Sequence, residues 1–187
     1  VVEYFRGLLL TLKGTSSEAM SVSVKWDGAP AVVCGTNPDN GKFFVGTKSV
    51  FSKTPKINYT KKDIATNHGT DELGQKLLKC LVHLKKLNIQ GVVQGDLLFV
   101  DDSITRKNID GKPHITFTPN TITYAIPEDG DLAKQIDRAK LGIIFHTTYA
   151  GDSLATMNAQ GGADVSSFAQ SPDVFFDNAS YKDVSGS

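Results

Sequence analysis

Short apolar runs and alternating segments recur along the chain and predict a sheet-rich protein. Residues 21–25 alternate polar and apolar side chains, which is the period of a half-buried strand. Residues 31–35 and 42–46 predict two more strands, and the turn between them is rich in Asn, Pro and Gly. These three segments predict an antiparallel meander at the start of a sheet.

Helical spacing appears in three places. Residues 71–87 follow a cap at Thr70 or Asp71 and predict the longest helix. Its apolar face consists of Leu73, Leu77, Cys80, Leu81 and Leu84. Residues 3–12 and 131–140 predict two shorter helices.

Further strands are predicted over residues 91–100, 115–118, 121–126, 141–148 and 173–176. The pattern therefore favours an α+β fold, with mainly antiparallel sheets and inserted helices. We expect one domain over residues 1–187, a fragment of a longer protein, in which residues 151–187 are weakly structured or peripheral.

Composition narrows the class of protein. The chain has 187 residues, 40% hydrophobic and 21% charged, which is an ordinary globular balance. Lys plus Arg and Asp plus Glu are both 20, so no net charge steers the whole molecule toward nucleic acid or an anionic membrane. The longest purely apolar run, residues 8–10, is too short to span a bilayer. Cys34 and Cys80 exclude a disulfide scaffold and favour a reducing compartment.

Lys25 is the first candidate for chemistry. It ends an alternating strand and is followed by Trp26 and by an Asp27-Gly28 turn. A lysine whose pKa is lowered by burial or by neighbouring cations can act as a nucleophile. Taken alone, the four residues are also consistent with a surface lysine before a common turn.

Four segments in order resemble motifs of the covalent nucleotidyltransferases, the superfamily of ATP-dependent DNA ligases, RNA ligases and mRNA capping enzymes. Lys25-Trp26-Asp27-Gly28 resembles motif I, and residues 46–49 (GTKS) resemble motif Ia. Residues 92–99 (VVQGDLLF) resemble motif III, and residues 142–149 (GIIFHTTY) resemble motif IIIa. The chain also looks like uncharacterised proteins of large tailed marine bacteriophages.

This resemblance implies an ATP-grasp-like ligase adenylation domain. Lys25 would attack the α-phosphate of ATP to form lysyl-AMP, as the first step in joining RNA or DNA ends. The nucleotide-binding residues would be Asp27, Gly28, Lys48, Gly95, Asp96 and Phe145. Asp96 would also hold Mg²⁺ or Mn²⁺, and Phe145 would stack on the base, with Tyr124 behind it. The resemblance further implies the cytoplasm of a phage-infected cell and no membrane partner.

The chain departs from the family pattern at several positions. Pro30 stands where motif I normally ends in Arg, and Asp96 stands where motif III has Glu. Motifs IV and V are not visible between residues 1 and 187. Either these motifs lie outside the sequence, or the protein is a catalytically degenerate nucleotide-binding or nucleic-acid-binding relative.

The sequence leaves two interpretations open for a lysine-rich segment, for two aromatic residues and for one histidine. Residues 41–62 contain six lysines and no acid, with four aromatic residues among them. This pattern suits either a nucleic-acid surface or a solvated loop that protects an edge strand. Phe145 and Tyr124 either stack on a base or pack in the core, and His146 is either part of the site or a hydrogen-bonded structural residue.

Overall fold

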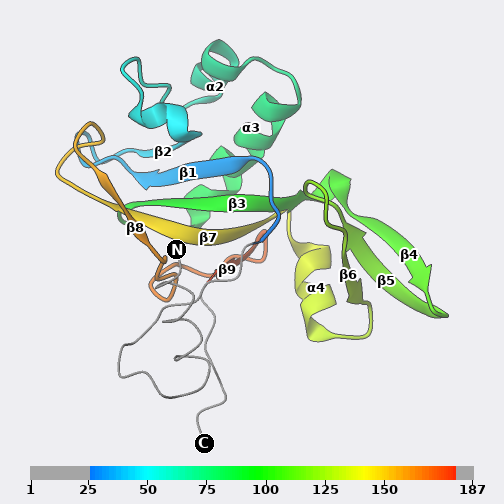
Figure 1. Cartoon of the computed structure of the whole chain (residues 1–187). Helices are drawn as coiled ribbons and strands as arrows, with labels where there is room; N and C mark the ends of the chain where they lie inside the picture. Colours follow the sequence, from blue (N-terminus) through cyan, green and yellow to red (C-terminus); the bar gives the residue numbers. More distant parts are fainter. Residues whose placement is uncertain (1–25, 180–187) are drawn as a thin grey trace, which may run out of the picture. The chain divides into compact units, whose positions relative to one another are not determined.

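The computed structural model describes residues 26–179, and these residues form one unit (Figure 1). The helix predicted over residues 3–12, the strand predicted over residues 21–25 and Lys25 itself lie outside the described residues.

The main sheet is built from six strands. They are β1 (Ala31–Thr36), β2 (Phe43–Gly46), β3 (Val92–Val100), β7 (Leu141–Ala150), β8 (Asn158–Gly161) and β9 (Val174–Asn178). The order is β2-β1-β3-β7-β8, all antiparallel, and β9 pairs with β7 in parallel. The central strand β3 and the first half of β7 are buried nearly throughout, whereas the residues of β7 from His146 onward are partly exposed.

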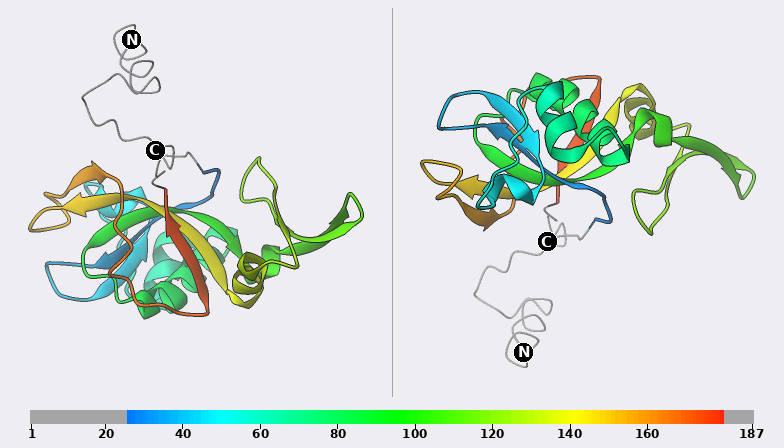
Figure 2. Two further views of the ribbon diagram at one scale, coloured as in Figure 1. Left: turned by 90° about the horizontal axis from the view of Figure 1, so that it is seen from below. Right: turned by 90° about the horizontal axis from the view of Figure 1, so that it is seen from above.

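Helices α2 (Lys61–His68) and α3 (Glu72–Leu84) cover one face of this sheet, as both views in Figure 2 show. Asp71 caps α3 by accepting a hydrogen bond from the backbone of Gly74, as its sequence position predicts. The buried residues Leu77, Cys80 and Leu84 of α3 belong to the main core, which confirms the apolar stripe. The helix α2 is not predicted from the sequence because it buries little besides Ile64.

A second, smaller sheet follows the order β4-β5-β6. Its strands are β4 (Thr105–Ile109), β5 (Lys112–Phe117) and β6 (Tyr124–Pro127), and α4 (Asp131–Arg138) comes next along the chain. β5 and β6 form a hairpin from the strands predicted over residues 115–118 and 121–126, with residues 118–123 as the loop between them. Strand β4 is not predicted from the sequence. All five of its residues are exposed, so it has no buried face to produce an alternating pattern of apolar and polar residues.

Three short 3₁₀ helices complete the described elements: η1 (Lys48–Phe51), η2 (Lys85–Leu87) and η3 (Asp101–Ser103). The expected class, α+β with mostly antiparallel sheets, is therefore confirmed. The expectation that the chain after residue 151 is peripheral needs correction. Strands β8 and β9 both join the main sheet, and Ala163, Phe168 and Val174 are buried in its core.

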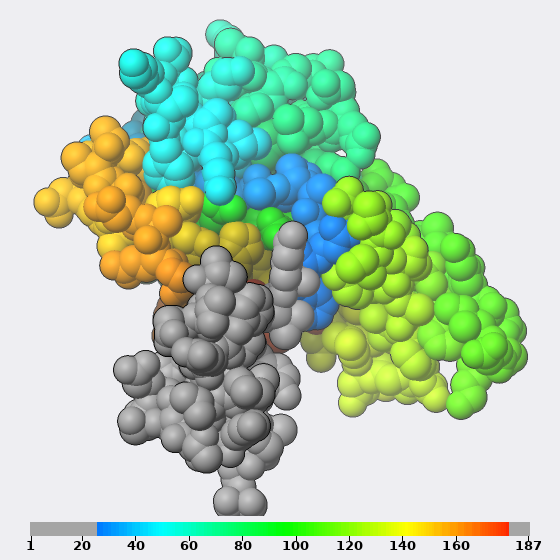
Figure 3. All heavy atoms as spheres, viewed as in Figure 1, coloured from blue at the N-terminus to red at the C-terminus, as the bar shows by residue number. Residues whose placement is uncertain are grey.

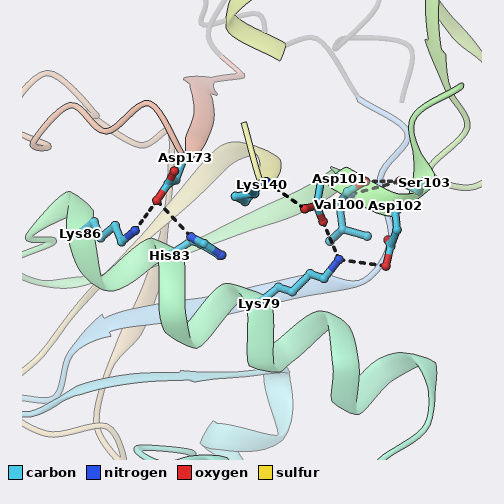
Figure 4. A network of polar contacts seen from close by, with 9 residues as sticks. All are labelled: Lys79, His83, Lys86, Val100, Asp101, Asp102, Ser103, Lys140 and Asp173. Carbon is cyan, nitrogen blue, oxygen red and sulfur yellow. Dashed lines mark hydrogen bonds and ion pairs between the residues drawn. The ribbon is translucent and has the colours of Figure 1, made fainter. Parts of the chain in front are cut away.

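Ion pairs fix α3 and the turn after it to neighbouring strand ends (Figure 4). Lys79 donates to Asp101 at 2.6 Å and to Asp102 at 2.9 Å, immediately after β3. Asp173, which precedes β9, pairs with Lys86 and lies 3.5 Å from His83 Nδ1. These contacts lower the pKa of Asp101 and Asp173 through hydrogen bonds from Lys79 and Lys86. The network is thus structural.

Both cysteines, Cys34 and Cys80, are buried and free, and burial raises the pKa of each thiol. Among residues 26–179, none of the helices has the length and apolar character needed to cross a membrane.

Candidate functional site

The Asp27-Gly28 turn lies directly against the middle of β3. A Cβ atom placed on Gly28 would be 2.6 Å from the Cβ of Asp96, so only glycine fits this approach. The Ala29 amide donates to the carbonyl of Leu97 at 3.0 Å, and Ala31 pairs with Asp96. The two segments that resemble motifs I and III are therefore neighbours in space, although nearly seventy residues separate Gly28 from Asp96.

The carboxylate of Asp27 is occupied by the loop that joins β5 to β6. Its oxygens accept hydrogen bonds from the Asn120 amide at 2.9 Å, from Thr121 N at 2.6 Å and from Ile122 N at 2.8 Å. The Thr121 hydroxyl adds a fourth bond at 3.0 Å. Hydrogen bonds from Ile122, Asn120 and Thr121 lower the pKa of Asp27 to about 2. Asp27 thus orients the turn, and its oxygens are engaged by the β5–β6 loop.

Tyr124 also holds the turn. Its hydroxyl accepts a hydrogen bond from the Asp27 amide at 3.0 Å, and its ring stacks on Trp26 with centroids 5.6 Å apart. Phe117 stacks on Tyr124 as well, at 5.4 Å. The ring of Tyr124 is therefore a packing element that fixes Trp26 and Asp27.

Asp96 points to the face of β3 opposite α3, because its neighbours Gly95 and Leu97 lie on the α3 side. Its Oδ1 is 3.4 Å from Nε2 of His146, and the two side chains are 25% and 29% exposed, respectively. His146 Nδ1 is 2.8 Å from the Thr147 hydroxyl. The accessible pair can therefore reach a ligand on this face.

A β-bulge brings His146 to this position. Gln94 pairs with Thr147 and the next residue, Gly95, pairs with Phe145, so His146 is the extra residue of β7. A Cβ on Gly95 would lie 2.6 Å from the carbonyl oxygen of Ile144. Gly95 therefore permits close strand packing, and its own contacts are with β7 rather than with a ligand.

Asp96 and His146 are two potential metal ligands. Within residues 26–179, no three His, Cys, Asp or Glu side chains come together as a set that could hold a metal ion. A divalent ion here would need water or substrate phosphate for its remaining positions, which is how Mg²⁺ usually binds beside nucleotides. The donor set fits such an ion.

Phe145 corrects the expectation of base stacking. It is 0% exposed, and Phe168 packs edge-on against it with centroids 5.4 Å apart and planes at 87°. It lies in the main core on the α3 side, because strand alternation turns it away from Asp96. A base has no access to its ring in this structure.

Lys48 is exposed and follows the end of β2. Gly46 pairs with Val33, two residues from Ala31, so Lys48 continues toward the end of β1 that lies beside Asp96. No contact joins Lys48 to Asp27 or Asp96 within the described part of the chain. Lys25 precedes Asp27 by two residues and lies outside the described residues.

A cavity of about 410 Å³ opens beside the turn, on the α3 side of β3. Ala29, Leu97, Lys76 and Lys79 are among its lining residues, and Asp96 is not. The cavity and the face that carries Asp96 and His146 are therefore separate.

The structure brings together Asp27, Gly28, Gly95 and Asp96. It places His146, for which the sequence left two roles open, beside Asp96, and it adds Asn120, which the sequence did not assign to the site. Asn120 lies between two strands predicted from the sequence, but its hydrogen bond to Asp27 on a distant segment leaves no sequence pattern. The comparisons found no match to this chain among curated proteins or solved structures. A family model described as "Family of unknown function (DUF6267)" matches residues 1–187, so the chain belongs to that family.

Proposed function

We propose that this protein is a nucleotidyltransferase domain of the ligase and capping-enzyme type. It would form a lysyl-AMP intermediate from ATP at Lys25, as the first step of RNA or DNA end joining. One observation carries the proposal: Gly28, three residues after Lys25, packs against Asp96. A nucleophilic lysine and a metal-binding carboxylate must lie close together for this chemistry, and the packing of Gly28 supports such an arrangement.

The reaction forms one bond and breaks another. The neutral Nζ of Lys25 attacks the α-phosphorus of ATP and forms a P–N bond. The bond from the α-phosphorus to the bridging oxygen breaks, and pyrophosphate leaves with that electron pair. The amine loses a proton to solvent. A divalent ion beside Asp96 would neutralise charge on the phosphates and favour the neutral amine.

The surrounding residues have distinct roles in this proposal. Gly28 allows the turn to approach β3, and Asp27 holds the turn through the β5–β6 loop. Asp96 binds Mg²⁺ or Mn²⁺, with His146 beside it. Lys48 provides a positive charge for phosphate at the same end of β1.

A second candidate function is nucleotide or nucleic-acid binding without covalent chemistry on the same fold. Three observations favour it: Pro30 stands in place of the motif I arginine, Asp27 is bound by its own loop, and Phe145 is buried. A degenerate domain would keep the turn against β3 and lose the transfer step.

Intact mass spectrometry separates the two candidates. The protein is incubated with ATP or GTP and with Mg²⁺ or Mn²⁺, alongside Lys25→Ala, Asp96→Asn and the control Lys107→Ala. Lys107 is exposed on β4, so its replacement leaves the site intact. We expect a nucleoside monophosphate adduct that is lost in Lys25→Ala, reduced in Asp96→Asn and retained in Lys107→Ala. Nucleotide-dependent thermal stabilisation without an adduct would support the degenerate domain. If the protein showed no adduct and no stabilisation, both candidates would be excluded.

A further inference from the structure

Positive charge is concentrated in one short segment of this chain. Six of the 20 basic residues lie between residues 41 and 62 and none of the 20 acids does, so this segment has a formal charge of +6 and the rest of the chain −6. All six lysines are exposed. We call them the lysine surface: Lys42, Lys48, Lys53, Lys56, Lys61 and Lys62. Figure 3 shows the cyan atoms of this segment gathered in one continuous region of the visible face.

The lysine surface lacks internal partners. Among the described residues, none of its six ammonium groups forms an ion pair, whereas five of the eight lysines elsewhere do. The ammonium of Lys56 donates only to the carbonyl of Asn67, at 3.1 Å. The charges of this surface are therefore available to a partner outside the chain.

The segment is an ordered scaffold rather than a solvated loop. Asn58 is 0% exposed, and its backbone bonds in both directions with Val45 on the outer edge of β2, at 3.0 and 3.1 Å. Thr60 and Asp63 form a capping box at the start of α2. Because the segment itself covers the edge of β2, most of its lysines are not needed to protect that edge.

Two of the lysines lie at positions where their charge destabilises a helix. Lys61 and Lys62 are the first two residues of α2, where the helix dipole disfavours positive charge. Such a placement is expected when the charges serve a contact outside the chain.

The chemistry of the segment indicates which partner it fits. The large exposed hydrophobic residues of the described chain, such as Val82 and Ile122, lie outside it, and it contains no arginine. A membrane-binding surface needs apolar residues, and a protein interface needs aromatic or arginine anchors. Exposed lysines without apolar or arginine anchors match the phosphate backbone of a nucleic acid.

The aromatic residues of the segment do not provide a stacking platform. Phe44 is 0% exposed, Phe51 packs on Tyr149 with ring centroids 4.4 Å apart, and the Tyr59 hydroxyl accepts a hydrogen bond from Asn37 at 2.7 Å. The fourth aromatic residue, Phe43, is partly buried against the main core, so all four rings are engaged in packing or hydrogen bonding. Binding would depend on phosphate charge alone and not on base sequence.

We propose that the lysine surface binds the phosphate backbone of a nucleic acid, independently of its sequence. The role of this surface in end joining rests on the proposed function, but the binding itself does not. With six contacts, the logarithm of the affinity for a duplex would fall with the logarithm of salt concentration at a slope of up to about −5.

Fluorescence anisotropy with a labelled oligonucleotide tests the proposal. Single-stranded and duplex DNA and RNA are titrated between about 50 and 200 mM salt, the range in which phosphate contacts weaken measurably. The test variant is Lys61→Glu with Lys62→Glu, because acids at a helix start favour the helix and keep α2 folded. The matched control is Lys107→Glu with Lys112→Glu, which changes the charge equally on the β4–β5 hairpin. Urea unfolding confirms that both variants are folded.

We expect the Lys61 and Lys62 variant to bind at least tenfold more weakly and to have a salt slope smaller by about 1.4 to 1.8. The control should change affinity less than twofold. Absence of wild-type binding at low salt, equal weakening in the control, or stronger binding to anionic vesicles than to nucleic acid would overturn the proposal. Nucleic-acid binding by the wild type is measured without ATP, so the absence of an ATP adduct and the absence of nucleic-acid binding remain separate results.

Discussion

Asp96 and His146 face each other across the bulge between β3 and β7, with Oδ1 and Nε2 3.4 Å apart. This separation is longer than a strong N–H···O hydrogen bond. Two adjacent ligands of an octahedral ion, each about 2.1 Å from it, lie about 3.0 Å apart, so the two side chains would have to approach by a few tenths of an ångström to share such an ion. The proposed function would use this pair to hold a divalent cation after that small movement.

Metal preference is the first prediction. Because imidazole suits Mn²⁺ better than Mg²⁺, His146→Ala should weaken Mn²⁺ binding more than Mg²⁺ binding, while Asp96→Asn should weaken both. Thermal unfolding with increasing metal measures this, since a ligand at ten times its Kd stabilises by about 1.4 kcal/mol. Asp152→Asn is the control, because Asp152 is exposed and lies beyond the end of β7, whereas His146 lies in the middle of that strand. Equal metal-induced shifts in the wild type and both site variants would exclude this site.

The close approach of Gly28 to β3 gives the second prediction. A methyl group there would meet the Cβ of Asp96 at 2.6 Å and the carbonyl of Leu97 at 3.0 Å, so Gly28→Ala must push the turn away from the strand. We expect a loss of about 1–3 kcal/mol in the free energy of unfolding, as for other overpacked sites. Gly91→Ala is the matched control, since no atom lies within 4 Å of its added Cβ. Urea denaturation measures both variants, and an equal effect in the two would contradict the packing argument.

Sequence periodicity predicted the elements whose buried face produces a regular pattern of apolar residues. The strands β1, β3 and β7 and the helix α3 appear as expected because each buries a continuous face. The strands β4 and β8 did not, since every residue in both is exposed. The parallel pairing of β9 with β7 was also missed, because strand direction depends on the path of the chain and not on local pattern.

The candidate site was predictable in part. The resemblance to motifs I and III associated Asp27 and Gly28 with Asp96, and the structure packs Gly28 against Asp96. The resemblance did not establish on which face of the sheet Phe145 lies, because an aromatic residue in a strand gives the same sequence pattern on either face. The bulge that turns His146 toward Asp96 has no sequence signature of its own.

Acid sensitivity of the Asp27 turn is the third prediction. The folded pKa of Asp27 is about 2, below the ordinary value of 3.8, so its carboxylate stabilises the fold above about pH 4. That contribution is lost as pH falls from about 4 toward 2, when the carboxylate gains a proton. Asp27→Asn directs an amide at the donors Thr121 N and Ile122 N, so the variant should unfold at lower urea at pH 7.

The difference between wild type and Asp27→Asn should then shrink as the pH is lowered to about 2. Asp152→Asn removes the same charge from an exposed position and should show no such convergence. A constant gap between wild type and Asp27→Asn at every pH would show that the carboxylate charge is not what holds the loop.

The fourth prediction distinguishes a core role for Phe145 from a base-stacking role. The side chain is fully buried between the main sheet and Phe168, so Phe145→Ala should leave a cavity and cost about 3–5 kcal/mol of unfolding free energy. Phe145→Leu keeps most of the volume and should cost less. Val82→Ala, at a position that is 51% exposed on α3, should cost little and serves as the surface control. If Phe145→Ala instead kept the wild-type stability but weakened nucleotide binding, the ring would have to reach a base, and the packing against Phe168 could not be its main role.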